Sequence, residues 1–140
     1  MCACVGNLVS FTVHGPPATK GSTVSFMGHS GKVITKADCK GLKGWSEAVG
    51  WAASAAKVPL ILKPHAVLVT VRFEFVRPPS VTDRYHPTVK PDVDKLLRAS
   101  LDALSGIGYQ DDAQVIEIRA LKVYGPKALT VFGIAPVVLI

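Results

Sequence analysis

The chain has 140 residues, of which 49% are apolar and 19% charged. That length and composition allow one folded domain with a hydrophobic core, spanning residues 1–140, and exclude a disordered chain. The formal net charge of +6 favours a polyanionic partner, nucleic acid first and an anionic membrane surface second, over a charge that serves solubility alone.

Cysteine usage and the two ends of the chain indicate the compartment. Cys2, Cys4 and Cys39 form no C-x-x-C pair, which favours free thiols over a disulfide framework or a zinc site. No basic leader with a long apolar run opens the chain, and the apolar tail 135–140 is too short to cross a bilayer. We therefore expect a reduced, cytoplasmic protein without membrane association, whose tail forms an edge strand or a packed segment.

The first half of the chain predicts strands followed by a helix. Residues 8–14 form a β-rich run that ends at a Gly-Pro-Pro turn. Residues 23–27 and 32–35 predict a hairpin around a glycine-containing turn. Apolar residues recur at helical spacing over 37–57, and glycines in the first part of this segment favour a late helix start.

The second half begins with a β-branched run over 65–76, then a proline-rich basic loop over 77–91. Residues 92–104 predict an amphipathic helix that glycines end, and strands are expected over 115–123, with one wet face, and 128–134. The expected buried stripe of the helix is Val93, Leu96, Leu97, Ser100, Leu101 and Leu104. The element order predicts a single α+β domain with a mixed β-sheet and two main helices.

Two acidic pairs flank this helix. Asp92 and Asp94 stand at its start, and Asp111 and Asp112 follow its end. Each pair alone has a structural interpretation, as a helix cap or a solvated turn. Together, however, clustered carboxylates repel each other unless a cation compensates, and oxygen ligands of this kind suit Mg²⁺.

The sequence therefore predicts that Asp92, Asp94 and Asp112, with Asp111 as a further candidate, bind one or two Mg²⁺ ions. A nearby cation, Arg98 or Lys95, would stabilise the negative charge that develops on a phosphate. The structural alternatives are an i,i+4 ion pair for Arg98 and a solvated lysine. Outside the acidic segment, six basic residues are candidate DNA contacts, although each alone is also typical of a solvated surface: Lys20, Lys32, Lys36, Arg77, Arg84 and Lys90.

The acidic segment carries a family resemblance. Residues 91–104 (Pro-Asp-Val-Asp-Lys-Leu-Leu-Arg-Ala-Ser-Leu-Asp-Ala-Leu), followed by 108–116 (Gly-Tyr-Gln-Asp-Asp-Ala-Gln-Val-Ile), resemble the signature of the RusA-like Holliday junction resolvases. These are endodeoxyribonucleases common in phages and prophages. The similarity is strong over residues 90–123 and weaker at the proline-rich turn 15–20.

The resemblance implies a homodimer that cuts four-way DNA junctions with Mg²⁺, acting in the host cytoplasm if phage-encoded. The family's metal-binding aspartates correspond to Asp92, Asp94 and Asp112. Two positions depart from its pattern: Lys95 stands where an asparagine is usual, and Arg98 where the catalytic lysine is usual. Because arginine keeps its proton, either Arg98 is a purely electrostatic clamp or Lys95 takes over the lysine's role.

Two other functions fit the same residues. One is a non-catalytic dimeric DNA-binding module in which the acids are caps and turns, and the other is a small regulatory or assembly protein. For a dimer, we expect the apolar strand over 69–75 and the tail over 137–140 to supply the contact surface.

Overall fold

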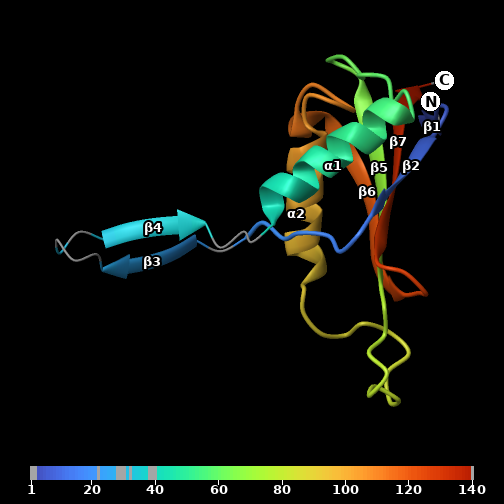
Figure 1. Ribbon diagram of the computed structural model, residues 1–140. Coiled ribbons are helices and arrows are strands. Elements are labelled where there is room, and N and C mark those ends of the chain that lie inside the picture. Colours follow the sequence, from blue (N-terminus) through green and yellow to red (C-terminus); the bar gives the residue numbers. More distant parts are fainter. Residues whose placement is uncertain (1–2, 22, 28–30, 32, 38–40, 140) are drawn as a thin grey trace.

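The computed structural model describes residues 3–21, 23–27, 31, 33–37 and 41–139. A curved mixed sheet carries both α-helices on one face (Figure 1). Its five strands are β1 (Ala3–Val5), β2 (Val9–His14), β5 (Ala66–Phe75), β6 (Val115–Tyr124) and β7 (Leu129–Leu139). The predicted α+β class is confirmed, as are both main helices.

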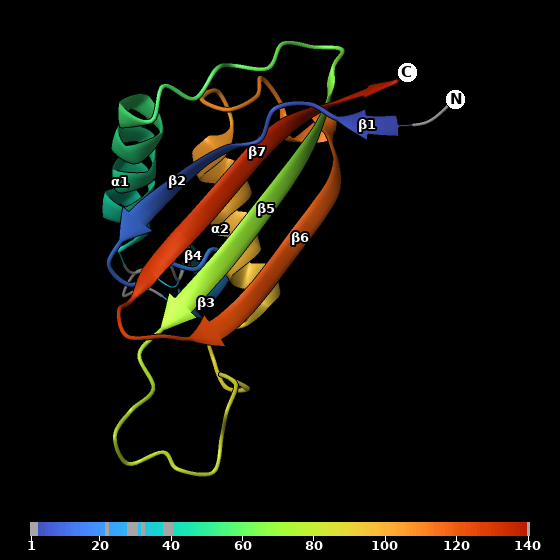
Figure 2. The ribbon, with the colours of Figure 1, turned by 90° about the vertical axis from the view of Figure 1, so that its right-hand side faces the viewer.

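Strand β7 organises the sheet. It pairs antiparallel with β1 and β2 along one side and with β5 along the other. β6 runs parallel to β5 and forms the outer edge, as Figure 2 shows. A parallel neighbour needs a crossover connection, and the chain between β5 and β6 supplies one that contains a long loop and the second helix.

The remaining elements are β3 (Thr23–Met27), β4 (Val33–Ala37), α1 (Leu42–Ala55), α2 (Val93–Leu104) and the short 3₁₀ helix η1 (Asp112–Gln114). β3 and β4 confirm the predicted hairpin, which stands apart from the main sheet in Figure 1; most of its turn lies outside the described residues. α1 begins late, as its glycines indicate. No helix in the described ranges is long and apolar enough to cross a membrane.

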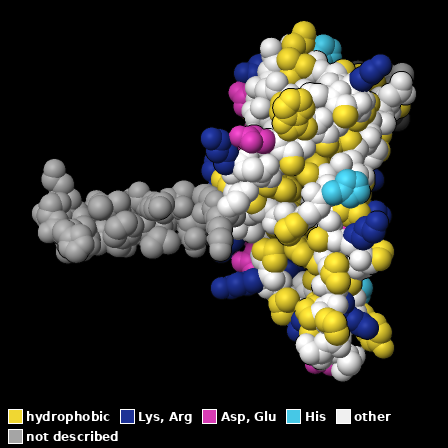
Figure 3. All heavy atoms as spheres, viewed as in Figure 1, with side chains coloured by type: hydrophobic (Ala, Val, Ile, Leu, Met, Phe, Trp, Pro, Cys, Tyr) yellow, Lys and Arg dark blue, Asp and Glu magenta, His cyan; other side chains and the backbone are white. Residues whose placement is uncertain are grey.

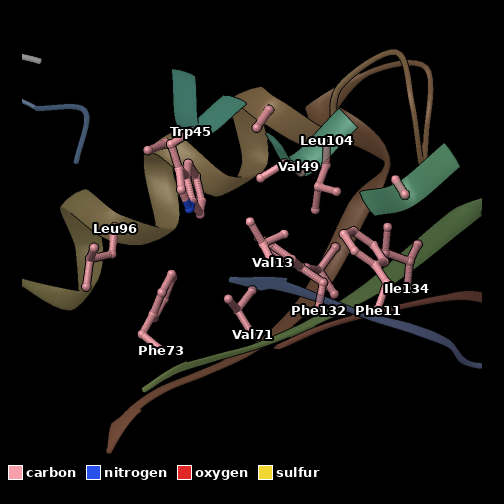
Figure 4. Close-up of a cluster of buried hydrophobic side chains, with 14 of the residues drawn as sticks. Phe11, Val13, Trp45, Val49, Val71, Phe73, Leu96, Leu104, Phe132 and Ile134 are labelled. Atoms are coloured by element: carbon pink, nitrogen blue, oxygen red, sulfur yellow. The ribbon is translucent and has the colours of Figure 1, made fainter. Parts of the chain in front are cut away.

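The core fills the space between the sheet and the two helices (Figure 4). Alternate residues of β5, among them Val71 and Phe73, point into it because successive side chains of a strand face opposite ways. From β7, Phe132 stacks on Phe11 with ring centroids 5.1 Å apart, and Trp45 of α1 lies 6.1 Å from Phe132. This core fixes α2 against the sheet and thereby positions the residues at both ends of the helix.

The buried face of α2 differs from the predicted stripe. Leu96, Ser100 and Leu104 are buried as expected, but Ala99 and Ala103 take the other inward positions. Both alanines belong to the buried cluster that also contains Trp45 and Val49 of α1. The prediction for Val93 was wrong, since it is 40% exposed, and Leu97 and Leu101 are only half-buried.

Three further expectations need correction. The tail is neither an edge nor a separate segment, because residues 135–139 extend β7, which pairs on both sides. The short β1 was not predicted. Val69, Val71 and Phe73 of β5 are buried in the core and offer no dimer surface. β6 is exposed on both faces over residues 116–119, rather than on one, because it is the edge strand of the sheet.

Candidate metal and nucleic-acid site

The start of α2 presents two carboxylates that the helix does not use for capping. Asp92 occupies the N-cap position in an extended conformation, yet its side chain makes no capping hydrogen bond. Asp94 lies in the first turn, where the helix dipole favours a negative charge. Both line one groove with residues 86–90 of the long loop and 120–122 of β6. Both are exposed, so their oxygen atoms remain open to an external cation.

Two basic side chains of α2 differ in their surroundings. Lys95 Nζ lies 3.7 Å from Asp92 Oδ2, and the Lys95 carbonyl oxygen accepts a 3.1 Å hydrogen bond from the backbone N–H of Lys20. A Cβ at Gly21 would lie 3.1 Å from the Lys95 side chain, so that chain segment packs closely on the lysine. Arg98 is exposed and makes no ion pair with any described residue. Its guanidinium is therefore the more available cation.

A second group of acidic side chains lies at the C-terminal end of α2. Asp112, at the start of η1, faces Asp102 of α2 and Tyr109. Partial burial, followed by the charge of Asp102, raises the pKa of the Asp112 carboxyl above its usual value. Tyr109 is buried and donates a 2.8 Å hydrogen bond to the Leu101 carbonyl. Burial and the nearby Asp112 raise the pKa of Tyr109 above the usual tyrosine range. An added cation would relieve the repulsion at this end, where Lys20 already pairs with Asp102.

Asp111 has a structural role of its own. Its Oδ1 accepts a hydrogen bond of 3.0 Å from the backbone of Ala113, and the Gln114 side chain accepts one from the Asp111 backbone, which completes a capping box. Its Oδ2 lies 3.0 Å from Lys63 Nζ. The Ala113 hydrogen bond and the lysine lower the pKa of the Asp111 carboxyl. Both oxygen atoms are thus engaged within the chain.

The length of α2 keeps the two acidic pairs apart. Ten residues separate Asp92 from Asp102, a rise of about 15 Å along the helix, and Asp112 lies beside Asp102. The structure brings Asp92 together with Asp94, and Asp111 together with Asp112, but it does not unite the two pairs. Within the described ranges, no three His, Cys, Asp or Glu side chains of one chain gather closely enough to hold a metal.

Three of the predicted DNA contacts lie on the long loop, and one of them, Lys90, lines the N-terminal groove. Arg84 donates to the Tyr124 hydroxyl at 3.3 Å, Arg77 donates to the Arg84 carbonyl at 3.4 Å, and Lys90 lines the groove beside Asp92. Figure 3 shows Lys and Arg side chains spread over one face, with acidic ones among them. Lys36 lies on β4, where only the backbone is described, and Lys32 lies outside the described residues.

Lys122 is a residue that sequence reasoning missed. Its ammonium group donates 2.9 Å hydrogen bonds to the carbonyl oxygens of Val89 and Pro91, so β6 holds the loop immediately before Asp92. The alternating pattern of the strand marks Lys122 only as a polar position. No signal in the sequence indicates its two backbone partners, which come from a distant loop.

Sequence comparisons relate the chain to a known family and to one further protein. The sequence profile of the family described as "Endodeoxyribonuclease RusA" matches residues 16–132, which include both acidic pairs, α2 and the strands β5 and β6. The chain is also similar to the uncharacterized protein YqaN of Bacillus subtilis strain 168, with 29% identity over 130 residues. That match covers 85% of this chain and 89% of the relative.

Proposed function

The chain belongs to the RusA endodeoxyribonuclease family, and on this premise we propose that it is a Mg²⁺-dependent, structure-selective endonuclease acting as a homodimer. Its substrates are four-way and other branched DNA junctions, resolved by paired phosphodiester hydrolysis. The observation that carries the proposal is the position of Asp92 and Asp94, two exposed carboxylates on one groove bordered by basic residues. Residues 1–140 act as one domain in the cytoplasm.

The chemistry of the donor set fits Mg²⁺. This ion takes oxygen ligands, usually one or two carboxylates together with water and phosphate oxygens, and Asp92 and Asp94 offer oxygens that the helix cap leaves unused. Bound there, Mg²⁺ would lower the pKa of a coordinated water and stabilise charge on the leaving oxygen. Asp112 is the expected third ligand. Asp111 is a weaker candidate, because both of its oxygens already have partners.

The chain's own cations then act on the phosphate. Arg98 lies one turn beyond Asp94 on the exposed face of α2, where its guanidinium can neutralise charge that develops on the phosphate oxygens. Arginine does not act as a proton donor, so its role is electrostatic. Lys95 holds Asp92 in place from 3.7 Å away. Arg77, Arg84 and Lys90 contact the DNA backbone, which makes binding independent of sequence and sensitive to salt.

The decisive experiment is a nicking assay on a synthetic four-way junction with Mg²⁺ or with EDTA, comparing the wild type with Asp94→Asn. We expect the wild type to nick only with Mg²⁺, and the variant to bind the junction at least as tightly without cutting it. The variant loses a ligand but also loses a charge that the phosphates repel. Binding by the wild type without cleavage would instead support the dimeric DNA-binding module.

A further inference from the structure

We propose that the cavity between the long loop (residues 77–91) and the ends of β5 and β6 binds one nucleobase of the branched DNA, unstacked from its neighbours. The base lies beside the groove that contains Asp92. This inference rests on the proposed function, and it adds a site for a DNA base to the site for the DNA phosphate. It also gives the protein a means of distinguishing branched DNA from continuous duplex.

Two neighbouring strands supply the aromatic part of the cavity. Phe75 and Tyr124 are partners in the parallel pairing of β5 with β6, so their side chains lie on the same face of the sheet. The long loop extends past the ends of both strands before α2 begins (Figure 2). The cavity is lined by the two aromatic residues, by Val76 and Pro78 after β5, and by residues 84, 87 and 89–91 of the loop.

The size and the lining of the cavity suit a single planar ring system. Its volume is about 150 Å³, which is below the roughly 300 Å³ at which sites for drug-sized molecules begin but about five times the share of one water molecule. The described residues that line it are aromatic, apolar or, in Arg84 and Lys90, cationic, and none is acidic. A nucleobase matches this lining, because its faces stack on aromatic rings and its edge carries hydrogen-bond acceptors.

The hydroxyl group of Tyr124 supplies a hydrogen-bond donor at the cavity. Arg84 donates to the Tyr124 oxygen from Nε at 3.4 Å and from Nη2 at 3.3 Å. Because the oxygen accepts from Arg84, its own proton is left to be donated, and it has no acceptor within the described part of the chain. A ring nitrogen or carbonyl oxygen of a base is an acceptor that fits this donor. The remaining N–H groups of Arg84 serve a DNA phosphate.

The cavity adjoins the groove that carries the candidate metal ligands. Residues 87, 89 and 90 line both hollows, and Pro91 of the cavity directly precedes Asp92 of the groove. Lys122 donates to the carbonyl oxygens of Val89 and Pro91, so it fixes the wall that the two hollows share. The base in the cavity therefore belongs to a nucleotide next to the phosphate that the groove binds.

A base site at this position gives a physical reason for selecting branched DNA. Taking a base out of a paired and stacked duplex costs free energy, and the cost is least where the base is mispaired or already unpaired. A branch point offers bases whose pairing and stacking are interrupted, whereas a continuous duplex does not. Stacking one base on an aromatic side chain raises affinity about five- to hundredfold. The cavity thus favours junctions over duplex of the same sequence.

An abasic scan tests for the base without using cleavage. Four-way junctions that lack one base, at each position near the branch point in turn, are titrated with the protein in EDTA. At one position the missing base should weaken wild-type binding at least about fivefold. Tyr124→Leu should bind the intact and the abasic junction equally. A wild type that responds to no abasic position would overturn the inference.

Two further variants control this scan. Tyr85→Leu makes the same change on a tyrosine of the same loop that is 85% exposed and outside the cavity, so it should respond as the wild type does. Val76→Trp fills the cavity from a position that is 53% exposed, and it should abolish the response even if Tyr124→Leu fails to fold. A full response in folded Val76→Trp would place the base outside the cavity and overturn the inference.

Photocrosslinking identifies the residue that the base contacts. A junction with 5-iodouracil at the position selected by the abasic scan is irradiated in complex with the protein, and the crosslinked peptide is identified by mass spectrometry. The crosslink should form at Tyr124 or Phe75, the two aromatic residues of the cavity. A crosslink at Tyr85 instead would place the base on the exposed part of the loop and overturn the inference.

A base isostere separates the Tyr124 hydroxyl group from its ring. Difluorotoluene has the shape of thymine but lacks strong hydrogen-bond acceptors. At the selected position, the wild type should bind it about two- to tenfold more weakly than thymine, because one hydrogen bond is lost. Tyr124→Phe should bind both junctions equally. An equal loss in the wild type and in Tyr124→Phe would overturn the role of the hydroxyl group.

A nicking assay on the same junctions separates this inference from the proposed nuclease. With Mg²⁺, the wild type should cut the intact junction faster than the junction that lacks the selected base, and Tyr124→Leu should cut both at the same rate. A wild type that cuts but shows no effect of any missing base would overturn the base site alone. A response to the missing base that depends on Tyr124, in a protein that does not cut, would overturn only the nuclease proposal.

Discussion

The two ends of α2 carry similar acidic pairs in different surroundings. At the N-terminal end, Asp92 and Asp94 are exposed on a groove, and Asp92 caps the helix without a side-chain hydrogen bond. At the C-terminal end, Asp111 is held by a capping box and by Lys63. Asp112 lies next to Asp102, whose negative charge repels it.

The difference separates carboxylates that build the fold from those free to bind a ligand. Asp111 stabilises a turn, so its position and charge are explained without a metal. Asp92, Asp94 and Asp112 are less fully engaged: Asp92 has a longer contact with Lys95, Asp94 faces solvent, and Asp112 contacts Tyr109 but is repelled by Asp102. The following predictions test this division, from the largest expected effect to the smallest.

An aspartate-to-asparagine substitution should mainly affect cleavage at the N-terminal end of α2 and mainly affect stability beyond its C-terminal end. Asp94→Asn should lower junction cleavage by more than the roughly 10–100-fold typical of losing a residue that only orients a ligand. Asp111→Asn should leave cleavage nearly unchanged but lower the melting temperature, because it weakens the capping box. Single-turnover nicking and thermal unfolding measure the two effects. Loss of cleavage in Asp111→Asn at full stability would place Asp111 among the ligands.

The two cationic side chains of α2, Arg98 and Lys95, should differ in how much they contribute to kcat. Arg98→Ala should lower kcat about 10–100-fold with little change in KM, since it removes a charge that acts in the transition state. Lys95→Ala should have a smaller effect on kcat, because Lys95 mainly positions Asp92. Arg98→Lys is the control that restores charge. An inactive Lys95→Ala beside an active Arg98→Ala would reverse the assignment.

The smallest effect concerns the pH dependence of stability. The pKa of Asp112 is raised in the folded protein, so the folded state binds its proton more tightly than the unfolded state does. Its contribution to stability is therefore present at low pH and is lost as pH rises through the titration range of the carboxyl. Without metal, Asp112→Asn should raise the melting temperature slightly at pH 7 and not at pH 3. Equal melting curves at both values would show that Asp112 is not destabilised by its surroundings.

Much of the fold was predictable because its signals are local. The β-branched run of β5, the amphipathic spacing of α2 and the glycines that delay α1 depend on neighbouring residues in the chain. The burial of Ala99 and Ala103 in place of Val93 was not predictable, because it depends on which face of α2 the rest of the core covers. The extension of β7 through Pro136 was missed for a similar reason: its partners β1 and β5 are distant in sequence.

The candidate site was likewise predictable only in part. Residue type and spacing pointed to Asp92, Asp94, Asp111 and Asp112. Sequence alone did not show that Asp111 is occupied by Ala113 and Lys63, nor that the chain after α2 leaves Asp112 beside Asp102. Those facts follow from the direction of the chain after α2. The role of Lys122 depends on a loop more than thirty residues earlier in the chain.

The contacts of Lys122 tie the outer strand of the sheet to the loop that leads into α2. Its ammonium group bonds to the carbonyl oxygens of Val89 and Pro91, so this part of the loop cannot shift without breaking two hydrogen bonds at β6. A substitution elsewhere in β6 that displaces Lys122 would therefore move the backbone at Asp92. Changes on the outer strand can in this way alter the groove without touching either carboxylate.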